Sequence, residues 1–432
     1  MPQTNRAYKA QVRTQRQNSN VVRLRSAKSK KNKQSGAARA PQKRTPASTS
    51  SGLLQAISGG KRLKPMDKTL LLVIIILVVF GLVMVFSASA PSASAYQNNP
   101  YHYIVRQAIF AVMGLVAMFF FSMFDYHKLG KMALWILGGA LLLLLAVYIP
   151  GIGIVRNNAR RWLNLGFSTL QPSEVVKVAL IIYFAYSLSN LKERIKEFKT
   201  GLLPQLIVLG VFALLLMAEP HLSATMIIGM TTVIMLLVAG ARIAHFVGLA
   251  VPVACAGIFY IMKNPYQLER IVTFLDPFAD PSDTGFQVVN SLYAIGSGGI
   301  FGLGLGQSRQ KYLYLPEPQN DFIFAIVCEE LGLVGALMVL FLFACLIWKG
   351  YRTAMTAPDL FGSLLATGIT SLVALQVLMN VAVVTSSMPA TGVALPFFSY
   401  GGTSLMILLC CMGILLNISR QTVAKPSDSA KI

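Results

Sequence analysis

Cysteine, charged residues and metal-binding motifs are all scarce in this sequence of 432 residues. Its five cysteines are too few for a disulfide scaffold, and no CxxC motif or His/Cys spacing typical of a zinc site occurs. Only 12% of the residues are charged, against about a quarter in a soluble domain, while 55% are hydrophobic. These proportions exclude soluble globular, coiled-coil, collagen-like and fully disordered proteins. They predict an all-α polytopic membrane protein, because a helix satisfies its own backbone hydrogen bonds inside the bilayer.

Acidic residues are also few, and the basic excess is distributed unevenly. Residues 1–68 contain 17 Lys/Arg and one acidic residue, Asp67, so they carry +16 of the formal net charge of +22. Low hydrophobicity and high charge predict that this segment is a disordered cytoplasmic tail. The tail either anchors the topology on the anionic inner leaflet or docks a partner protein. Nucleic acid is not expected, because aromatic residues are not interleaved with the basic ones.

Apolar runs long enough to cross about 30 Å of hydrocarbon recur along the rest of the chain. They predict about ten transmembrane helices within one transmembrane domain, residues 69–420, followed by a short cytoplasmic tail, residues 421–432. The fifth and sixth spans are the least distinct, because only the break at 218–221 separates them. The predicted spans are residues 69–89, 104–123, 132–149, 172–188, 202–218, 223–239, 243–262, 321–348, 361–386 and 397–417.

Lys and Arg in short loops predict sidedness, because basic loops remain in the cytoplasm. Basic residues fall on alternate connections, on the same side as the N-terminal tail. These residues are Lys128, Lys131, Lys192, Arg194, Lys196, Lys199, Arg242, Lys349, Arg352, Arg420 and Lys425. Both termini are therefore predicted to be cytoplasmic, as an even number of spans requires. The intervening loops 90–103 and 387–396 have no charged residue and are expected outside.

Two segments on the predicted outer side carry cations against this rule. Residues 150–171 contain three arginines, and residues 263–320 form one large extracytoplasmic loop of mixed charge. Chance is one explanation, and an anionic ligand such as phosphate or pyrophosphate is the functional one. Within the large loop, residues 285–295 are predicted to form a short interfacial helix. The glycine-dense stretch 296–306 fits no nucleotide-binding motif and is expected to allow close backbone packing.

Glu174, Lys177 and Asp321 are charged residues at or inside predicted spans. Glu174 lies in the first turn of the fourth span, where a carboxylate can cap the helix. Lys177 is one turn deeper, and a charge inside an apolar helix suggests a function. Asp321 begins the eighth span, where it is either a capping carboxylate or a general base at the outer membrane face.

Two adjacent glutamates, Glu329 and Glu330, follow deeper in the eighth span. Neighbouring residues point in different directions on a helix, so these two are not expected to form an acid/base pair. They are predicted to make structural contacts with other helices, with Asn380 and Gln376 as candidate partners. The four histidines are scattered, and no Ser/His/Asp set is visible.

The sequence carries an ordered set of motifs. They read RRWL at 160–163, QPSEVVK at 171–177, DFIFA at 321–325, EELG at 329–332, MPATG at 388–392 and LPFFSYGG at 395–402. Together, over residues 69–420, they resemble the SEDS family of bacterial cell-wall proteins, which includes FtsW, RodA and SpoVE. Many relatives have a histidine where this chain has Gln319, which removes a histidine as an obligatory proton relay here.

The resemblance implies a peptidoglycan glycosyltransferase that polymerises lipid II at the outer face of the cytoplasmic membrane. It implies that Asp321 is the catalytic general base for the attacking sugar hydroxyl. Outer cations would stabilise the charge on the departing pyrophosphate. The expected substrate-binding residues are Arg161, Trp162, Glu174, Lys177, Arg270, Gln287 and Lys311. Trp162 is equally explained as part of an aromatic belt at the membrane interface.

Cofactor and partners are expectations from the same resemblance. No metal motif occurs, but a divalent cation, Mg²⁺ or Mn²⁺, that bridges pyrophosphate and Asp321 stays open. The implied partners are a class B penicillin-binding protein transpeptidase and other proteins of the division machinery. The long basic tail and the spelling of the motifs favour the FtsW or SpoVE branch over RodA, and hence septal cell-wall synthesis.

A lipid II flippase is the main alternative, suggested by the many spans and the charges within them. A transporter is expected to bind its substrate near the midplane, between repeated halves. No convincing internal repeat is present, and the charges cluster at the outer face. The sequence therefore favours a polymerase, with RodA-like elongation or SpoVE-like sporulation as alternatives within the family.

Overall fold

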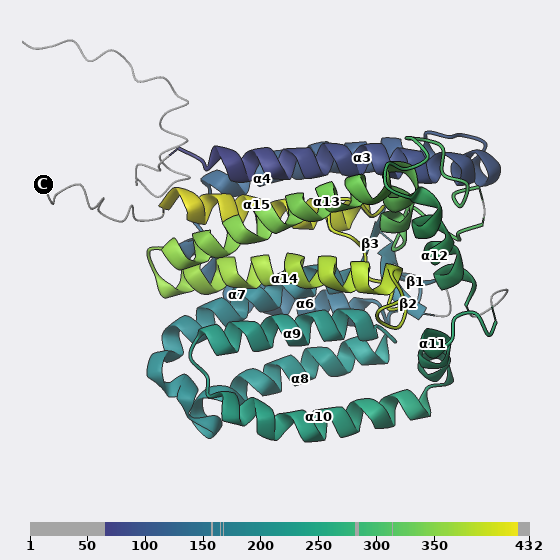
Figure 1. Ribbon diagram of the computed structural model, residues 1–432. Helices are drawn as coiled ribbons and strands as arrows, with labels where there is room; N and C mark the ends of the chain where they lie inside the picture. Colours follow the sequence, from purple (N-terminus) through teal and green to yellow (C-terminus); the bar gives the residue numbers. More distant parts are fainter. Residues whose placement is uncertain are drawn as a thin grey trace, which may run out of the picture. The chain divides into compact units, whose positions relative to one another are not determined.

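The computed structural model describes residues 65–156, 159–164, 166, 168–280, 285–312 and 314–421. Residues 1–64 and 422–432 lie outside the described residues, so the predictions for the two tails are not tested. The described chain from residue 65 onwards is a bundle of long helices that run side by side (Figure 1).

Each predicted apolar range coincides with a helix of the structure. These helices are α3 (Lys68–Gln97), α4 (His102–Met123), α6 (Ala133–Ala146), α7 (Pro172–Leu191), α8 (Leu203–Ala218), α9 (Leu222–Val238), α10 (Ile243–Lys263), α13 (Ile323–Thr356), α14 (Leu360–Val384) and α15 (Gly402–Gln421). Among the described residues, eight helices are long and apolar enough to cross a membrane, one of them α8 together with the turn of π-helix before it (Phe198–Ala218), whereas α6 and α9 have only 14 and 17 residues. The helical membrane fold is confirmed, and the count of ten spans stays a prediction.

Shorter elements form the connections. They are α5 (His127–Lys131), the 3-10 helix η1 (Lys192–Lys196), the π-helix η2 (Phe198–Leu202), α11 (Pro265–Leu275), α12 (Phe286–Gly298), β1 (Gly153–Arg156), β2 (Ala159–Asn164) and β3 (Thr169–Leu170). The three strands form an antiparallel sheet in the order β1-β2-β3. Helix α12 confirms the short helix predicted at 285–295. The sheet and α11 were not predicted, because their segments are short and mixed in polarity.

The connections divide between the two ends of the bundle (Figure 1). The basic connections gather at one end, whereas the sheet, α11 and α12 lie at the other. At the basic end, Lys349 Nζ lies 3.1 Å from an Asp67 carboxylate oxygen. At the opposite end, the Tyr400 backbone N–H donates to the Gln319 carbonyl at 2.8 Å. The alternation expected from charge is therefore present in the fold, while the end that faces the cytoplasm stays a prediction.

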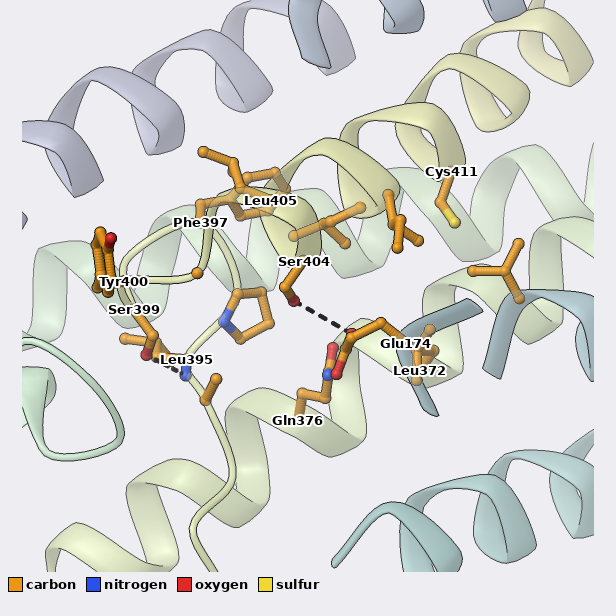
Figure 2. Close-up of a pocket in the computed structure, with 16 residues that line it drawn as sticks. Glu174, Leu372, Gln376, Leu395, Phe397, Ser399, Tyr400, Ser404, Leu405 and Cys411 are labelled. Atoms are coloured by element: carbon orange, nitrogen blue, oxygen red, sulfur yellow. Dashed lines mark hydrogen bonds between the residues drawn. The ribbon is translucent and has the colours of Figure 1, made fainter. Parts of the chain in front are cut away.

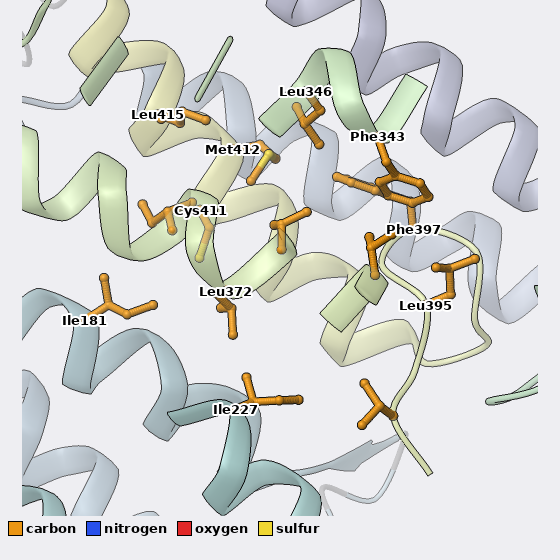
Figure 3. Packing of buried hydrophobic residues seen from close by; sticks show 14 of the residues in the cluster. Ile181, Ile227, Phe343, Leu346, Leu372, Leu395, Phe397, Cys411, Met412 and Leu415 are labelled. Atoms are coloured by element: carbon orange, nitrogen blue, oxygen red, sulfur yellow. The ribbon is translucent and has the colours of Figure 1, made fainter. Parts of the chain in front are cut away.

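One part of the apolar core lies where α13, α14 and α15 meet the segment that precedes α15, and the core continues into α3, α7 and α9. The ring centroid of Phe343 on α13 lies 6.4 Å from that of Phe397 (Figure 3) and 5.9 Å from that of Phe398. Helix α14 is largely buried, whereas none of the residues of α10 is buried. The exposed surface of α10 is apolar, which suits contact with lipid.

Helix α13 is broken at Gly332, and the glycine-dense stretch packs into the break. Gly332 has φ 65° and ψ −165°, a conformation that only glycine adopts readily. Backbone hydrogen bonds of 2.9–3.1 Å join the two segments on both sides of the break. These bonds run from Leu303 to Glu329, from Gly304 to Glu330, from Leu333 to Gly299 and from Val334 to Ile300. The close backbone packing predicted for residues 296–306 is thus confirmed.

Gly332→Ala is expected to lower the free energy of unfolding by at least about 2 kcal/mol, because the left-handed backbone is strained for alanine. The added Cβ would also lie 2.3 Å from the Gly302 nitrogen and 2.5 Å from the Ile300 oxygen. Thermal unfolding in detergent measures the loss. Gly138→Ala in α6 is the matched control, because the Cβ that it adds has no described atom of a neighbouring helix within 4 Å. Equal stability of the two variants would contradict the role of Gly332.

Candidate active site

Asp321 ends the large loop at the end of the bundle that carries the sheet. Its side chain is half-buried, and Phe322 rather than Asp321 is the N-cap residue of α13. A Cβ built on Gly392 would lie 3.5 Å from Asp321 Oδ2, so the segment after α14 passes close to this carboxyl group. The position therefore does not support the capping explanation for Asp321.

Arg270 of α11 reaches the same segment. Its Nη1 donates to the Ala390 carbonyl at 2.5 Å, two residues before Gly392. Burial raises the pKa of Asp321 above its usual value, while the nearby positive charge of Arg270 opposes the rise and the negative charge of Glu317 adds to it. The fold thus joins two predicted site residues, a carboxyl group with a raised pKa and a cation, that are far apart in the sequence.

Glu174 and Lys177 form an ion pair in the first turns of α7. Lys177 Nζ lies 2.7 Å from Glu174 Oε1, and Lys177 is buried. Ser404 of α15 donates to Glu174 Oε2 at 3.2 Å, and Glu174 lines a cavity of about 40 Å³ between α7, α14 and α15 (Figure 2). A cavity of this size, with Glu174, Gln376 and Ser404 among its lining residues, has room for water. The carboxylate of Glu174 therefore contacts Lys177 and Ser404 and faces a cavity, rather than capping the end of α7.

Arg161 and Trp162 lie on β2, at the same end of the bundle. Arg161 donates through Nε to the Glu219 carbonyl at 3.1 Å and through Nη2 to the Pro220 carbonyl. It thereby fastens the sheet to the turn between α8 and α9. Trp162 is half-buried and pairs with Ile154 of β1.

Comparison with known proteins places this geometry in a family. The FtsW/RodA/SpoVE family model, a cell cycle protein family, matches residues 67–424. The chain belongs to this family. Stage V sporulation protein E of Bacillus subtilis (strain 168) is 44% identical over 354 residues, which are 82% of this chain and 97% of that protein. A probable peptidoglycan glycosyltransferase FtsW of Geobacter sp. (strain M18) is 41% identical over 360 residues, 83% of this chain and 98% of that one.

Solved structures share the fold. A chain of a peptidoglycan synthase complex, studied for its coordination of polymerization and crosslinking, superposes with a TM-score of 0.67 at 27% identity. The match covers 83% of this chain and 99% of that chain. The rod shape determining protein RodA of Thermus thermophilus superposes with a TM-score of 0.61 at 25% identity, over 83% of this chain and 98% of RodA.

In this member of the FtsW/RodA/SpoVE family, Lys311 is not brought to the site. It is only 3% exposed, and its Nζ lies 2.8 Å from Glu330 Oε1 and 3.2 Å from Ser87 Oγ. Glu330 stands seven residues after the start of α13, roughly 10 Å along the helix axis. The geometry therefore gives no support to the expectation that Lys311 binds substrate, because its charge is already neutralised inside the fold.

The other loop and span residues take different positions. Gln287 is exposed in the first turn of α12. Glu329 accepts from Ser308 Oγ and from the Arg309 backbone N–H, so its contacts are structural but lie in the large loop and not, as predicted, on other helices. Asn380 was expected beside the glutamates, but its Nδ2 instead donates to the carbonyl of Asp321 at 2.6 Å. Sequence periodicity cannot place Asn380 there, because the contact depends on how the large loop returns to α14.

Two residues of the turn between α8 and α9 were missed as candidates. Glu219 is 2% exposed, and both of its carboxylate oxygens lack a hydrogen-bond partner among the residues that the structure describes. Burial raises the pKa of Glu219 to about 8, against the opposing charge of Arg161. Burial, aided by the charges of Arg161 and Lys177, lowers the pKa of His221 to about 3. The available signal was the polar break at 218–221, between two apolar runs.

The sequence left open whether a divalent metal ion binds near Asp321. Within the described ranges, no group of three or more His, Cys, Asp or Glu side chains could hold a metal ion. Near Asp321 the second acidic side chain is Glu317, so these two residues offer two carboxylate groups to a cation. A divalent cation carried by the pyrophosphate of a substrate stays a prediction.

Proposed function

We propose that this chain is a peptidoglycan glycosyltransferase that polymerises lipid II at the outer face of the cytoplasmic membrane. The names of its relatives supply the reaction class, and the half-buried carboxyl group of Asp321 beside Arg270 carries the assignment. Asp321 accepts the proton of the acceptor 4-hydroxyl while the oxygen attacks C1 of the donor sugar. The new glycosidic bond forms as the bond from C1 to the phosphate oxygen breaks, and undecaprenyl pyrophosphate leaves.

A raised pKa suits Asp321 to this role. A general base is most effective when its pKa approaches the working pH, and burial moves the pKa of this carboxyl in that direction. Arg270 stands where a cation can stabilise the charge of the departing pyrophosphate. Arg161, Trp162, Glu174, Lys177 and Gln287 are proposed to contact the sugars and phosphates. Lys311 is left out, because it is buried in its ion pair with Glu330.

Purified full-length protein mixed with lipid II tests the proposal. Glycan chains resolved by gel electrophoresis are expected from the wild-type protein and not from Asp321→Asn. A vesicle assay with labelled lipid II separates the flippase alternative. Movement of lipid across the bilayer without glycan formation would favour transport and contradict polymerisation.

Arg270→Gln is expected to shift the pH dependence of polymerisation. Asp321 must be ionised to accept a proton, so the rate falls as the pH is lowered through its pKa. Because the charge of Arg270 lowers that pKa, its removal raises the pKa further and moves the acidic limb of the rate profile to higher pH. Initial rates between pH 5 and 9 (an approximate range that brackets the shift) measure the limb. Arg270→Lys keeps the charge and is the control, and a limb that moves equally in both variants would contradict the electrostatic role.

A partner that crosslinks glycan strands is proposed as well. The similarity to a chain of a peptidoglycan synthase complex supports assembly with a transpeptidase, which we identify as a class B penicillin-binding protein. We place the chain at the division septum, with both termini in the cytoplasm. A fluorescent fusion found along the side wall rather than at midcell would favour a RodA-like role instead.

A further inference from the structure

Three of residues 390–393, which follow α14, each accept a hydrogen bond from a different part of the chain, and the fourth, Gly392, passes close to Asp321. The hydrogen bonds run from Arg270 of α11 to the Ala390 carbonyl, from Ser223 of α9 to the Thr391 carbonyl and from Asn380 of α14 to the Val393 carbonyl, and a Cβ built on Gly392 would lie 3.5 Å from Asp321 Oδ2. We call these four residues the 390–393 segment. Because the segment accepts a hydrogen bond from Arg270 and passes close to Asp321, its position influences the distance between the carboxyl group and the cation.

Asn380 is the side chain that joins this segment to Asp321 directly. Its Nδ2 donates to the Asp321 carbonyl at 2.6 Å and to the Val393 carbonyl at 2.7 Å. Both partners are acceptors only, so the amide nitrogen and not the oxygen must face them. Asn380 is 1% exposed, and water therefore cannot replace these hydrogen bonds without rearrangement.

From this geometry we propose that Asn380 is a positioning residue for the catalytic carboxylate. The proposal rests on the proposed function of Asp321. Asn380 fixes the position of the Asp321 main chain relative to the 390–393 segment, and hence relative to Arg270. It touches neither substrate nor reacting atoms, and it acts through the residue that does.

The electrostatic surroundings make the proposal measurable. Arg270 and Glu317 are the charged groups that act on Asp321. Ser223 from α9 and Asn380 from α14, which join at the 390–393 segment, are uncharged. If the two hydrogen bonds of Asn380 are lost, Arg270 moves with the 390–393 segment, and its charge lowers the pKa of Asp321 less strongly. A substitution of the uncharged Asn380 is therefore expected to change the pKa of Asp321.

Asn380→Ala is expected to lower kcat about 10- to 100-fold, because a small misplacement of a reacting group has an effect of this size. KM for lipid II is expected to change less than about threefold, since substrate contacts remain. The acidic limb of the rate profile is expected to move to higher pH by about one unit, as weaker attraction from Arg270 predicts. Asn380→Ser keeps one hydrogen-bond donor and is expected to fall between alanine and wild type.

Ser371→Ala is the matched control. Ser371 is also buried on α14, and its hydroxyl pairs with Tyr351 of α13 at 2.9 Å, away from Asp321. Its loss removes a partly buried hydrogen bond from α14 to α13, so a drop in thermal stability with an unchanged acidic limb is expected.

The outcomes separate the two claims. A shifted limb in Asn380→Ala and Asn380→Ser, with none in Ser371→Ala, supports positioning. Unchanged limbs in the Asn380 variants, when Asp321→Asn is inactive, overturn the positioning role alone. Wild-type polymerisation by Asp321→Asn overturns the proposed function first. If Asn380→Ala does not fold, Asn380→Ser decides by the position of its limb.

Discussion

Asp321→Asn is expected to reduce polymerisation of lipid II by about 10²- to 10⁴-fold, the usual contribution of a general base. The substitution keeps the size of the side chain but removes its ability to accept a proton as a carboxylate. The fold is expected to persist, because the carbonyl that bonds Asn380 belongs to the main chain. Glycan synthesis by the purified variant, compared with its thermal unfolding, separates lost chemistry from lost structure.

Glu269→Gln is the control for this experiment. Glu269 is an exposed carboxylate on α11, next to Arg270 in the sequence. Its neutralisation changes the net charge of the same end of the molecule by the same amount, and near-wild-type polymerisation is expected. Full activity of Asp321→Asn would mean that another group accepts the proton. Loss of activity in both variants would point to the overall charge rather than to Asp321.

Lys311→Met is expected to have the largest effect on stability. It leaves Glu330, which is fully buried, without its cation. Removing one partner of a buried ion pair typically lowers the free energy of unfolding by about 3–5 kcal/mol, because the remaining charge stays uncompensated. Thermal and chemical unfolding in detergent measure the loss. The hydrogen bond from Ser87 to Glu330 is insufficient to offset a full charge.

The double variant Lys311→Met with Glu330→Gln tests the cause of that loss. With both charges removed, most of the stability is expected to return. Lys196→Met is the exposed counterpart, since Lys196 pairs with Glu193 at the surface, and this variant is expected to unfold at nearly the wild-type temperature. A double variant as unstable as Lys311→Met alone would show that packing, and not charge, is responsible.

The helices could be predicted from the sequence because the thickness of the hydrocarbon layer sets the length of each apolar run, independently of the other runs. A stretch such as residues 361–386 is long and apolar by itself, and the structure forms α14 there. Asp321, Glu174 and Lys177 stood out for the same reason, since a charge at the edge of an apolar run is visible without knowledge of its neighbours. The sheet at residues 153–170 was missed, because its strands are too short for a period to emerge.

Contacts between residues that are far apart in the sequence could not be predicted in this way. Lys311 looked like a free outer cation, yet the large loop returns to α13 and buries it against Glu330. Asn380 looked like a partner for a glutamate, yet it holds the carbonyl of Asp321. Both contacts join residues whose separation is set by how a long loop packs, and such packing depends on many distant residues at once.

The sequence alone therefore determined that this protein is a helical membrane protein, which residues interrupt its apolar runs, and which family its motifs resemble. Only the tertiary structure decided that Arg270 and Asp321 share the 390–393 segment and that Lys311 is an internal ion-pair partner. The reason is physical. Burial of an apolar run is a local property of the chain, whereas compensation of a charge requires a second group brought from elsewhere in the fold.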